Sequence, residues 1–179
     1  PAMGGLGLVG ARLSRRRAKL SRIPDDELHG FVRVDYLGGG QFPLYRAAAL
    51  RAAGVHRPEL FFGFEELDQG LRLVHAGGQL YVDGGMLRGA RRDYQVKSVR
   101  RTRTSGPEGS WRSYYSARNF VAIMRENAPG YPSVIAALRH GLIGPSLGVV
   151  SQRRTALEAR LAARGAWDGW RGRLGRTVP

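Results

Sequence analysis

The sequence predicts an α/β fold with an α-helical extension at its C-terminal end. Two strand-like segments, Phe31 to Leu37 and Gln79 to Asp83, are separated by segments with helical periodicity. From Ser110 onward the chain reads as helical, with breaks at prolines and glycines. With 179 residues, 42% of them hydrophobic, it is long enough to bury a core. We therefore expect a strand-containing part over residues 1–109 and a helical part over residues 110–179.

Apolar alternation, glycines and prolines divide the first part into short elements. In order, we expect a strand from Leu6 to Leu13, an exposed loop from Ser14 to Gly30, a strand from Phe31 to Leu37, a helix from about Pro43 to Ala53, a helix from about Glu65 to Ala76, a strand from Gln79 to Asp83 and a mobile loop from Arg88 to Gly109. Pro43 suits a first helical turn and Gly54 a C-terminal cap. Acidic residues at the start of the second helix complement the helix dipole.

The second part is predicted to be helical and to lie outside the hydrocarbon core of a membrane. Its expected helices are about Ser110 to Glu126, Ser133 to Leu142 and Ser151 to Ala163. The longest apolar stretch, Val134 to Val150, contains Arg139, His140 and Pro145 and falls short of the ~20 apolar residues that spanning requires. No transmembrane helix is predicted.

Charge and cysteine content narrow the function classes. The formal net charge is +15, but Lys19 and Lys97 are the only lysines, so nearly all the positive charge is arginine. That skew, with abundant alanine and glycine, is typical of GC-rich coding, and it weakens the case for a nucleic-acid partner. Anionic lipid or pyrophosphate is a stronger candidate reason for the charge than nucleic acid, and an ordinary solvated surface is the remaining explanation. Without cysteine, a disulfide framework, a thiolate zinc site and a cysteine nucleophile are excluded.

The most informative segment places acidic residues at a helix start directly after an aromatic turn. It reads Phe61-Phe62-Gly63-Phe64-Glu65-Glu66-Leu67-Asp68-Gln69-Gly70-Leu71-Arg72. A purely structural interpretation is available, because Asp68 and Arg72 are i,i+4 partners and the two glutamates complement the helix dipole. The alternative is that the carboxylates are positioned for chemistry.

The order of the surrounding motifs favours the second interpretation, because it resembles that of the family-2 glycosyltransferases. The matching motifs are Val34-Asp-Tyr-Leu-Gly-Gly-Gly, Tyr45-Arg46, Gly54, Phe61-Phe62-Gly63-Phe64-Glu65-Glu66, Arg72 and Ala76-Gly77-Gly78. Tyr114-Tyr115-Ser-Ala-Arg118-Asn119 is similar to a pattern that follows the catalytic domain in many members. The resemblance runs from about Leu6 to Asp93. It implies a GT-A fold with a mixed sheet, of which residues 1–109 are the acceptor-side half, and it implies that the donor-binding half lies outside this chain.

The resemblance also implies roles for individual residues. In the family's Glu-Asp motif the second acid is the catalytic base, and Glu66 holds that position here, one methylene longer than the usual Asp. An inverting transfer needs a base that removes the acceptor hydroxyl proton on the face opposite the departing nucleotide, which a carboxylate at a rigid helix start can do. The implied acceptor-binding residues are Glu65, Asp68 and Tyr36, and the implied donor/acceptor loop is Gly38, Gly39 and Gly40.

A divalent metal, Mg²⁺ or Mn²⁺, is expected for the full enzyme, because the family's donor half carries an Asp-x-Asp motif at a strand end. Asp25 and Asp26 follow Pro24 in a polar loop and do not fit that motif. The stretch after Leu80-Tyr-Val-Asp also lacks the histidine that binds metal in many members. Four scattered histidines have no ligand spacing, so no metal ligand is assigned within this chain.

The partners implied by the resemblance are a nucleotide-sugar donor and a glycan or polyprenyl-linked acceptor, as in bacterial cell-wall or surface polysaccharide synthesis. We expect a cytoplasmic location, with peripheral attachment to the inner face of the membrane as an alternative to free solution. The tail from about Ser151 is the candidate for contact with an anionic membrane. Its apolar residues Leu157, Leu161, Trp167, Trp170 and Leu174 alternate with arginines, although packing on the domain explains the same pattern.

Two other functions remain open from the sequence. A basic nucleic-acid-binding module would use Arg15 to Arg17 and Arg88 to Arg103 on phosphates, but it leaves the acidic aromatic motif without a role, so no nucleic acid is expected as a partner. A truncated chain with only a scaffolding role is the second alternative. An Asp-x-Asp motif upstream in the same reading frame would distinguish the glycosyltransferase from both.

Overall fold

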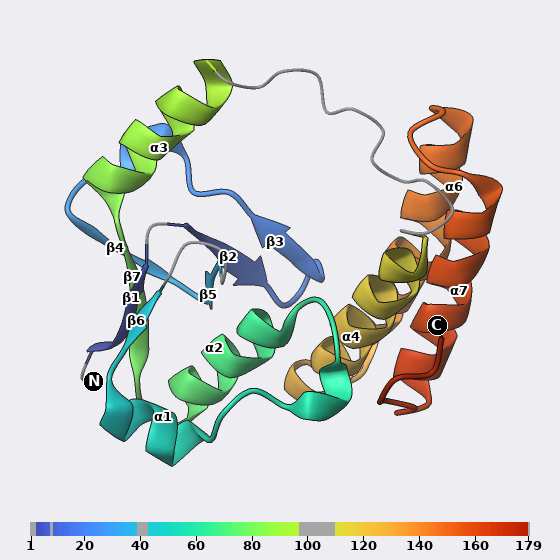
Figure 1. The fold of residues 1–179 in the computed structure, drawn as a ribbon, viewed down its shortest axis with the longest axis horizontal. Helices are drawn as coiled ribbons and strands as arrows, with labels where there is room; N and C mark the ends of the chain where they lie inside the picture. Colours follow the sequence, from blue (N-terminus) through green and yellow to red (C-terminus); the bar gives the residue numbers. More distant parts are fainter. Residues whose placement is uncertain (1–2, 8, 39–42, 97–109, 179) are drawn as a thin grey trace. The chain divides into compact units, whose positions relative to one another are not determined.

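The computed structural model describes residues 3–7, 9–38, 43–96 and 110–178, and it divides into two compact units (Figure 1). The first, which we call the sheet unit, comprises Pro1–Ser14, Leu20–His56 and Glu66–Arg100. The second, the helical unit, comprises Arg15–Lys19, Arg57–Glu65 and Arg101–Pro179. The helical unit thus contains two short segments from the N-terminal part of the chain, Arg15–Lys19 and Arg57–Glu65, and the division expected near residue 109 stays a prediction.

A mixed four-stranded sheet forms the centre of the sheet unit, in the order β4-β7-β1-β6. β1 (Met3–Gly7) runs parallel to β7 (Gln79–Asp83). β4 (Phe31–Val34) pairs with β7, and β6 (Leu44–Tyr45) pairs with β1, both antiparallel. The predicted α/β class, the mixed sheet and the C-terminal helices are confirmed, and the strand from Gln79 to Asp83 has the expected bounds.

A second, three-stranded sheet has the order β3-β2-β5. It consists of β3 (Lys19–Ser21), β2 (Gly10–Ser14) and β5 (Tyr36–Leu37), with a short 3₁₀ turn η1 (Asp25–Glu27) after β3. The expectation of one strand from Leu6 to Leu13 was wrong, because this region supplies strands to two different sheets. The expected loop from Ser14 to Gly30 likewise contains β3 and η1.

Three helices complete the sheet unit: α1 (Ala47–Ala53), α2 (Glu65–His75) and α3 (Gly84–Val96). The core beneath them is built from buried aliphatic side chains of β4, β7 and the helices. Its members include Val32, Val34, Leu73, Leu80, Val82 and Leu87. Gly70 of α2 packs so tightly that an added Cβ would lie 2.6 Å from the carbonyl oxygen of Asp35.

Two expectations in the sheet unit were wrong for identifiable reasons. The first helix begins at Ala47 rather than Pro43, because Leu44 and Tyr45 pair with Leu6 and Gly5 of β1. The expected mobile loop begins inside a helix, because α3 covers residues 84–96. Asp83 Oδ1 accepts a hydrogen bond from the backbone N–H of Met86 at 2.9 Å, which satisfies a donor in the first turn of that helix. Residues 97–109 lie outside the described part.

The helical unit is organised around α4 (Trp111–Asn127) and α7 (Ala156–Trp170), which lie side by side in Figure 1. Two glycines of α7 permit this close approach. A Cβ on Gly165 would lie 2.1 Å from the carbonyl oxygen of Tyr114, and a Cβ on Gly169 would lie 2.1 Å from that of Arg118. The expected end of this helix near Ala163 was therefore wrong, because the helix continues through Gly165, which serves packing rather than helix termination.

The start of α7 also differs from the expectation. Thr155 caps the helix, its Oγ1 accepting from the backbone N–H of Glu158, while the Glu158 carboxylate accepts from the N–H of Thr155 at 2.7 Å. This reciprocal capping box satisfies two donors that the first turn leaves unpaired. The helix accordingly begins at Ala156 rather than at Ser151.

The segment between α4 and α7 is one continuous helix, longer than the expected helix from Ser133 to Leu142. α5 (Tyr131–Leu138) continues through a π-helical turn, η5 (Arg139–Ile143), into α6 (Gly144–Val150). The wider π turn precedes Pro145 and accommodates this proline within the helix. His140 in this turn is largely buried against Phe120, with ring centroids 4.1 Å apart.

Candidate acceptor-side active site

The start of α2 is preceded by a tightly turned segment, Pro58–Phe64, which we call the aromatic loop. It opens with the 3₁₀ turn η3 (Pro58–Leu60). Phe61 and Phe64 then adopt left-handed backbone conformations, with φ of 60° and 66°, and Gly63 has φ of 81°. A left-handed backbone conformation is unfavourable for the two non-glycine residues, so contacts from outside the loop are needed to stabilise it.

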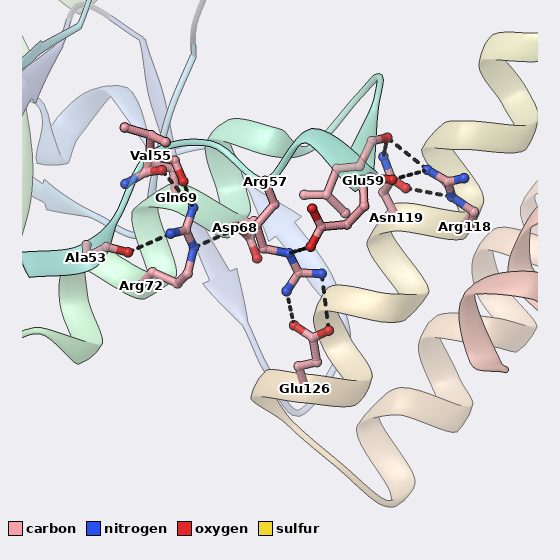
Figure 2. Close-up of polar contacts among 11 residues, drawn as sticks. Ala53, Val55, Arg57, Glu59, Asp68, Gln69, Arg72, Arg118, Asn119 and Glu126 are labelled. Atoms are coloured by element: carbon pink, nitrogen blue, oxygen red, sulfur yellow. Dashed lines mark hydrogen bonds and ion pairs between the residues drawn. The ribbon is translucent and has the colours of Figure 1, made fainter. Parts of the chain in front are cut away.

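The support comes from two adjacent, fully buried polar residues of α4, Arg118 and Asn119 (Figure 2). Asn119 Nδ2 donates to the carbonyl oxygens of Leu60, Phe62 and Gly63, at 2.8 Å in each case. Arg118 Nη2 donates to the carbonyl of Leu60 at 2.9 Å, and its Nε donates to Asn119 Oδ1 at 2.9 Å. Arg118 and Asn119 therefore fix the backbone of the aromatic loop. These hydrogen bonds also satisfy the two buried side chains, whose burial without partners would cost free energy.

The same pair secures the end of the chain. Arg118 Nη1 donates to the carbonyl of Gly175, and the N–H of Gly175 donates to the carbonyl of Glu59 at 2.7 Å. Burial lowers the pKa of Arg118 from its usual value, against the opposing influence of the neighbouring tyrosines and Asp168. Tyr115 Oη accepts from the N–H groups of residues 177 and 178, each at 3.1 Å. The C-terminal segment thus packs beside the aromatic loop.

Aromatic rings and an ion-pair cluster complete the support. The rings of Phe61 and Tyr115 have centroids 4.8 Å apart, and those of Phe62 and Trp111 are 4.9 Å apart. At the start of the loop, Arg57 forms ion pairs with Glu59 at 3.2 Å and with Glu126 of α4 at 2.6 Å (Figure 2). The conformation of the segment that leads into α2 is therefore set by contacts within the helical unit.

In the sheet unit, Glu66 lies in the first turn of α2 and acts electrostatically on Tyr45 of β6. The pKa of Tyr45 is raised to about 12, chiefly by burial, then by the negative charge of Glu66 and by Tyr36. The predicted base and the predicted acceptor-binding tyrosine thus both influence the pKa of one further tyrosine, although burial has the larger effect. Because its pKa is about 12, Tyr45 remains protonated at neutral pH and its hydroxyl can donate a hydrogen bond.

Open space lies beside both tyrosines. Tyr36 lines a cavity of about 470 Å³ together with residues of β2, β3 and α3, among them Arg22 and Arg91. Tyr45 lines a smaller hollow of about 250 Å³ with Gly5 and Arg46. Gly5 lets the Tyr45 ring lie on β1, since a Cβ there would be 2.7 Å from the ring. The two tyrosines are therefore accessible to a ligand on the sheet unit.

Asp68 has a structural partner. Its side chain is buried, and its Oδ2 accepts from Arg72 Nε at 2.9 Å (Figure 2). Arg72 also donates to the carbonyls of Ala53 at 2.6 Å and Val55 at 2.7 Å, which ties α2 to the segment after α1. This ion pair is the i,i+4 contact that the structural interpretation of the motif expects, and the acceptor-binding role of Asp68 stays a prediction.

The other predicted site residues are placed as follows. Glu65 is partly buried at the first position of α2, and its Oε2 is buried without a hydrogen-bond partner among the described residues. Gly38 donates its N–H to the carbonyl of Val9 at 2.8 Å. Gly39 and Gly40 lie outside the described residues.

Across the described residues no group of three or more His, Asp or Glu side chains is arranged to hold a metal ion. The divalent cation implied by the family resemblance therefore has no fitting ligand set in this part of the chain. The cluster of Asp25 with Arg22 and Arg91 is an ion-pair site instead, and hydrogen bonds from the two arginines lower the pKa of the Asp25 carboxyl.

Tyr45 is the residue that reasoning from the sequence left out of the site. The Tyr45-Arg46 dipeptide was part of the family-like pattern, but its pairing with β1 depends on contacts between residues far apart in the chain. Comparisons with protein-family models, with curated proteins and with solved structures found no match.

Proposed function

We propose that this chain forms the acceptor side of an inverting glycosyltransferase. It would move a sugar from a nucleotide-sugar donor to a glycan or lipid-linked saccharide, with Glu66 as general base. The observation that supports the proposal is that Glu66, at the start of α2, is near enough to Tyr45 for its charge to raise the pKa of that phenol, while Tyr45 and Tyr36 each line a cavity of the sheet unit. A carboxylate next to hydroxyl donors is suited to bind and deprotonate a sugar hydroxyl.

In this mechanism Glu66 accepts the proton of the acceptor hydroxyl as its oxygen attacks the anomeric carbon. The bond from that carbon to the nucleotide breaks on the opposite face, so the anomeric configuration inverts. A positioned general base contributes about 10²–10⁴ to the rate. The protonated Tyr45 would donate a hydrogen bond to the acceptor or to the Glu66 carboxylate, and Tyr36 would line the cavity through which the acceptor enters.

The helix that carries Glu66 needs rigid support for this role, because a catalytic group misplaced by about 1 Å lowers the rate of the reaction substantially. Within the sheet unit, Arg72 donates to the carbonyls of Ala53 and Val55 and so ties the helix that carries Glu66 to the segment after α1. A metal ion in the donor half would neutralise charge on the departing diphosphate. The steps assigned to this chain concern the acceptor alone.

The scaffolding and nucleic-acid alternatives predict no such chemistry. They are tested by incubating the complete protein with a panel of nucleoside-diphosphate sugars and saccharide acceptors, and by determining the anomeric configuration of any product by nuclear magnetic resonance. We expect transfer with inversion. Transfer with retention would contradict the base mechanism, and no transfer across the panel would favour a scaffold.

A second experiment tests Tyr45 within the same proposal. Replacing Tyr45→Phe removes one hydroxyl from the site, and we expect a fall in kcat/KM of about tenfold or more, as for the loss of one hydrogen bond to a reacting group. Tyr81→Phe is the matched control in the sheet unit, because the Tyr81 hydroxyl donates to Gln79 Oε1 within the same strand and lines none of the cavities described. Equal kinetics for both variants would remove Tyr45 from the site.

A further inference from the structure

The helix from Tyr131 to Val150 presents an apolar surface that the rest of the helical unit leaves uncovered. It is 20 residues long, apolar enough by length and composition to cross a membrane, and only 22% buried. Among its exposed large apolar residues are Tyr131, Val134, Leu138, Leu142, Leu147 and Val150. Scattered exposed leucines need no explanation, but a continuous apolar helix face marks an interaction site.

An apolar groove adjoins this face. Val134, Leu138 and Leu142 line one side of it, and Ala163, Trp167 and Trp170 of α7 line the other. Its volume is about 360 Å³. Trp167 is 60% exposed at this groove, where an indole could enter a lipid headgroup layer.

The charge around the face has one sign. Residues 127–179 contain eight arginines and only two acids, Glu158 and Asp168. All eight arginines are exposed, whereas both acids are buried. Glu158 is engaged in the capping box, and Asp168 Oδ2 accepts from Tyr114 Oη at 2.8 Å. Arg139 lies within the helix itself, and the guanidinium of Arg171 lies 5.5 Å from the ring centroid of Trp167, which lines the groove. The apolar surface therefore has exposed arginines beside it, although Arg164 and Arg173 also pair with Asp168.

We infer that this face binds the surface of an anionic lipid bilayer, with the helix Tyr131–Val150 lying in the interface and the arginines reaching the headgroups. An apolar face with arginines on its polar sides is the pattern of interfacial helices. Nucleic acid would use the arginines but would leave the apolar side chains in water. A second copy of this chain would bring eight further arginines against the same surface, and like charges would oppose the contact.

The helix is inferred to lie on the membrane rather than to span it, because part of its surface is committed to the helical unit. Ser133, Ala136, Gly141 and Pro145 are buried along its length. A Cβ on Gly141 would lie 2.6 Å from the Cβ of Ala166 in α7. The inference moves the expected membrane contact from the tail after Ser151 to this helix, since α7 itself packs on α4.

Sedimentation of the complete protein with vesicles tests this proposal without using sugar transfer, so its outcome is separate from that of the proposed function. We expect binding to phosphatidylglycerol-containing vesicles, weakened by high salt, and much weaker binding to phosphatidylcholine vesicles. The double variant Leu142→Gln, Leu147→Gln should reduce the partition coefficient about tenfold or more, because both side chains are exposed in the free protein and would be buried in lipid.

Val55→Gln is the matched control, since Val55 is 78% exposed in the sheet unit and should leave binding unchanged. Tryptophan emission should shift to the blue on addition of anionic vesicles, and Trp167→Phe should remove most of that shift while circular dichroism shows the fold intact. Undiminished binding by the leucine variant, or equal binding to neutral vesicles at high salt, would overturn the inference. The inference would also be overturned if the wild-type protein did not bind vesicles but self-associated, and if the leucine variant abolished that self-association.

Discussion

Replacing Asn119→Leu should destabilise the helical unit by an amount that the hydrogen bonds set. Asn119 Nδ2 donates to three carbonyls, but that of Leu60 also accepts from Arg118, so the variant leaves the carbonyls of Phe62 and Gly63 without this donor. It also removes Asn119 Oδ1, which accepts from the buried Nε of Arg118. An unpaired buried acceptor costs about 1–3 kcal/mol, and both residues are only partly buried. We therefore expect a loss of about 2–4 kcal/mol in the free energy of unfolding.

Tryptophan fluorescence during urea unfolding measures this loss specifically, because all three tryptophans, at positions 111, 167 and 170, belong to the helical unit. Asn127→Leu is the matched control on the same helix. Asn127 Nδ2 donates at 2.8 Å only to the carbonyl of Ile123 within α4, so its replacement should cost at most about 0.5 kcal/mol. Equal and small losses for the two variants would refute the claim that Asn119 holds the aromatic loop.

Two further predictions concern the helical unit. Gly169→Ala should destabilise this unit by about 1–3 kcal/mol or more, because the new Cβ would lie 2.1 Å from the carbonyl oxygen of Arg118. Gly89→Ala in α3 is the control: nothing lies within 4 Å of a Cβ there, so the variant should be neutral or stabilised by up to about 1 kcal/mol. Thermal unfolding followed by circular dichroism compares the two variants. Burial and two neighbouring arginines lower the pKa of His140 to about 4, below the usual 6.5. As the pH falls from 6.5 towards 4, the unfolded chain therefore protonates this histidine before the folded protein does, and the free energy of unfolding decreases. One pKa unit corresponds to about 1.4 kcal/mol, so between pH 7 and pH 4 the unfolding free energy of the wild type should fall by about 3 kcal/mol more than that of His140→Gln. Parallel curves of unfolding free energy against pH for the two proteins would contradict the lowered pKa of His140.

Local signals predicted those elements whose stability is itself local. Alternation marked the strand from Gln79 to Asp83, and the acidic first turn marked the start of α2. The sequence was misread where distant partners decide. Leu44 and Tyr45 pair with β1 rather than starting a helix, and Gly165 is retained in a helix because it contacts the backbone of α4. Periodicity carries no information about such partners.

In the candidate site, too, local signals were readable from the sequence and long-range contacts were not. Glu65 and Glu66 could be singled out because they follow an aromatic turn at a helix start. The role of Arg118 and Asn119 could not, because more than 50 residues separate each of them from the carbonyls that they bind. Asp68 was ambiguous in the sequence, and the buried contact with Arg72 supplies a structural reason for it.

The most direct test of the central claim is the turnover of the complete protein carrying Glu66→Gln. The amide keeps the size of the side chain but cannot accept the acceptor proton, so kcat should fall about a hundredfold or more while the affinity for the nucleotide-sugar donor stays nearly unchanged. Asp26→Asn, which neutralises an exposed acid in η1, should leave both quantities intact. Near-normal turnover by the Glu66→Gln variant would contradict its assignment as the general base.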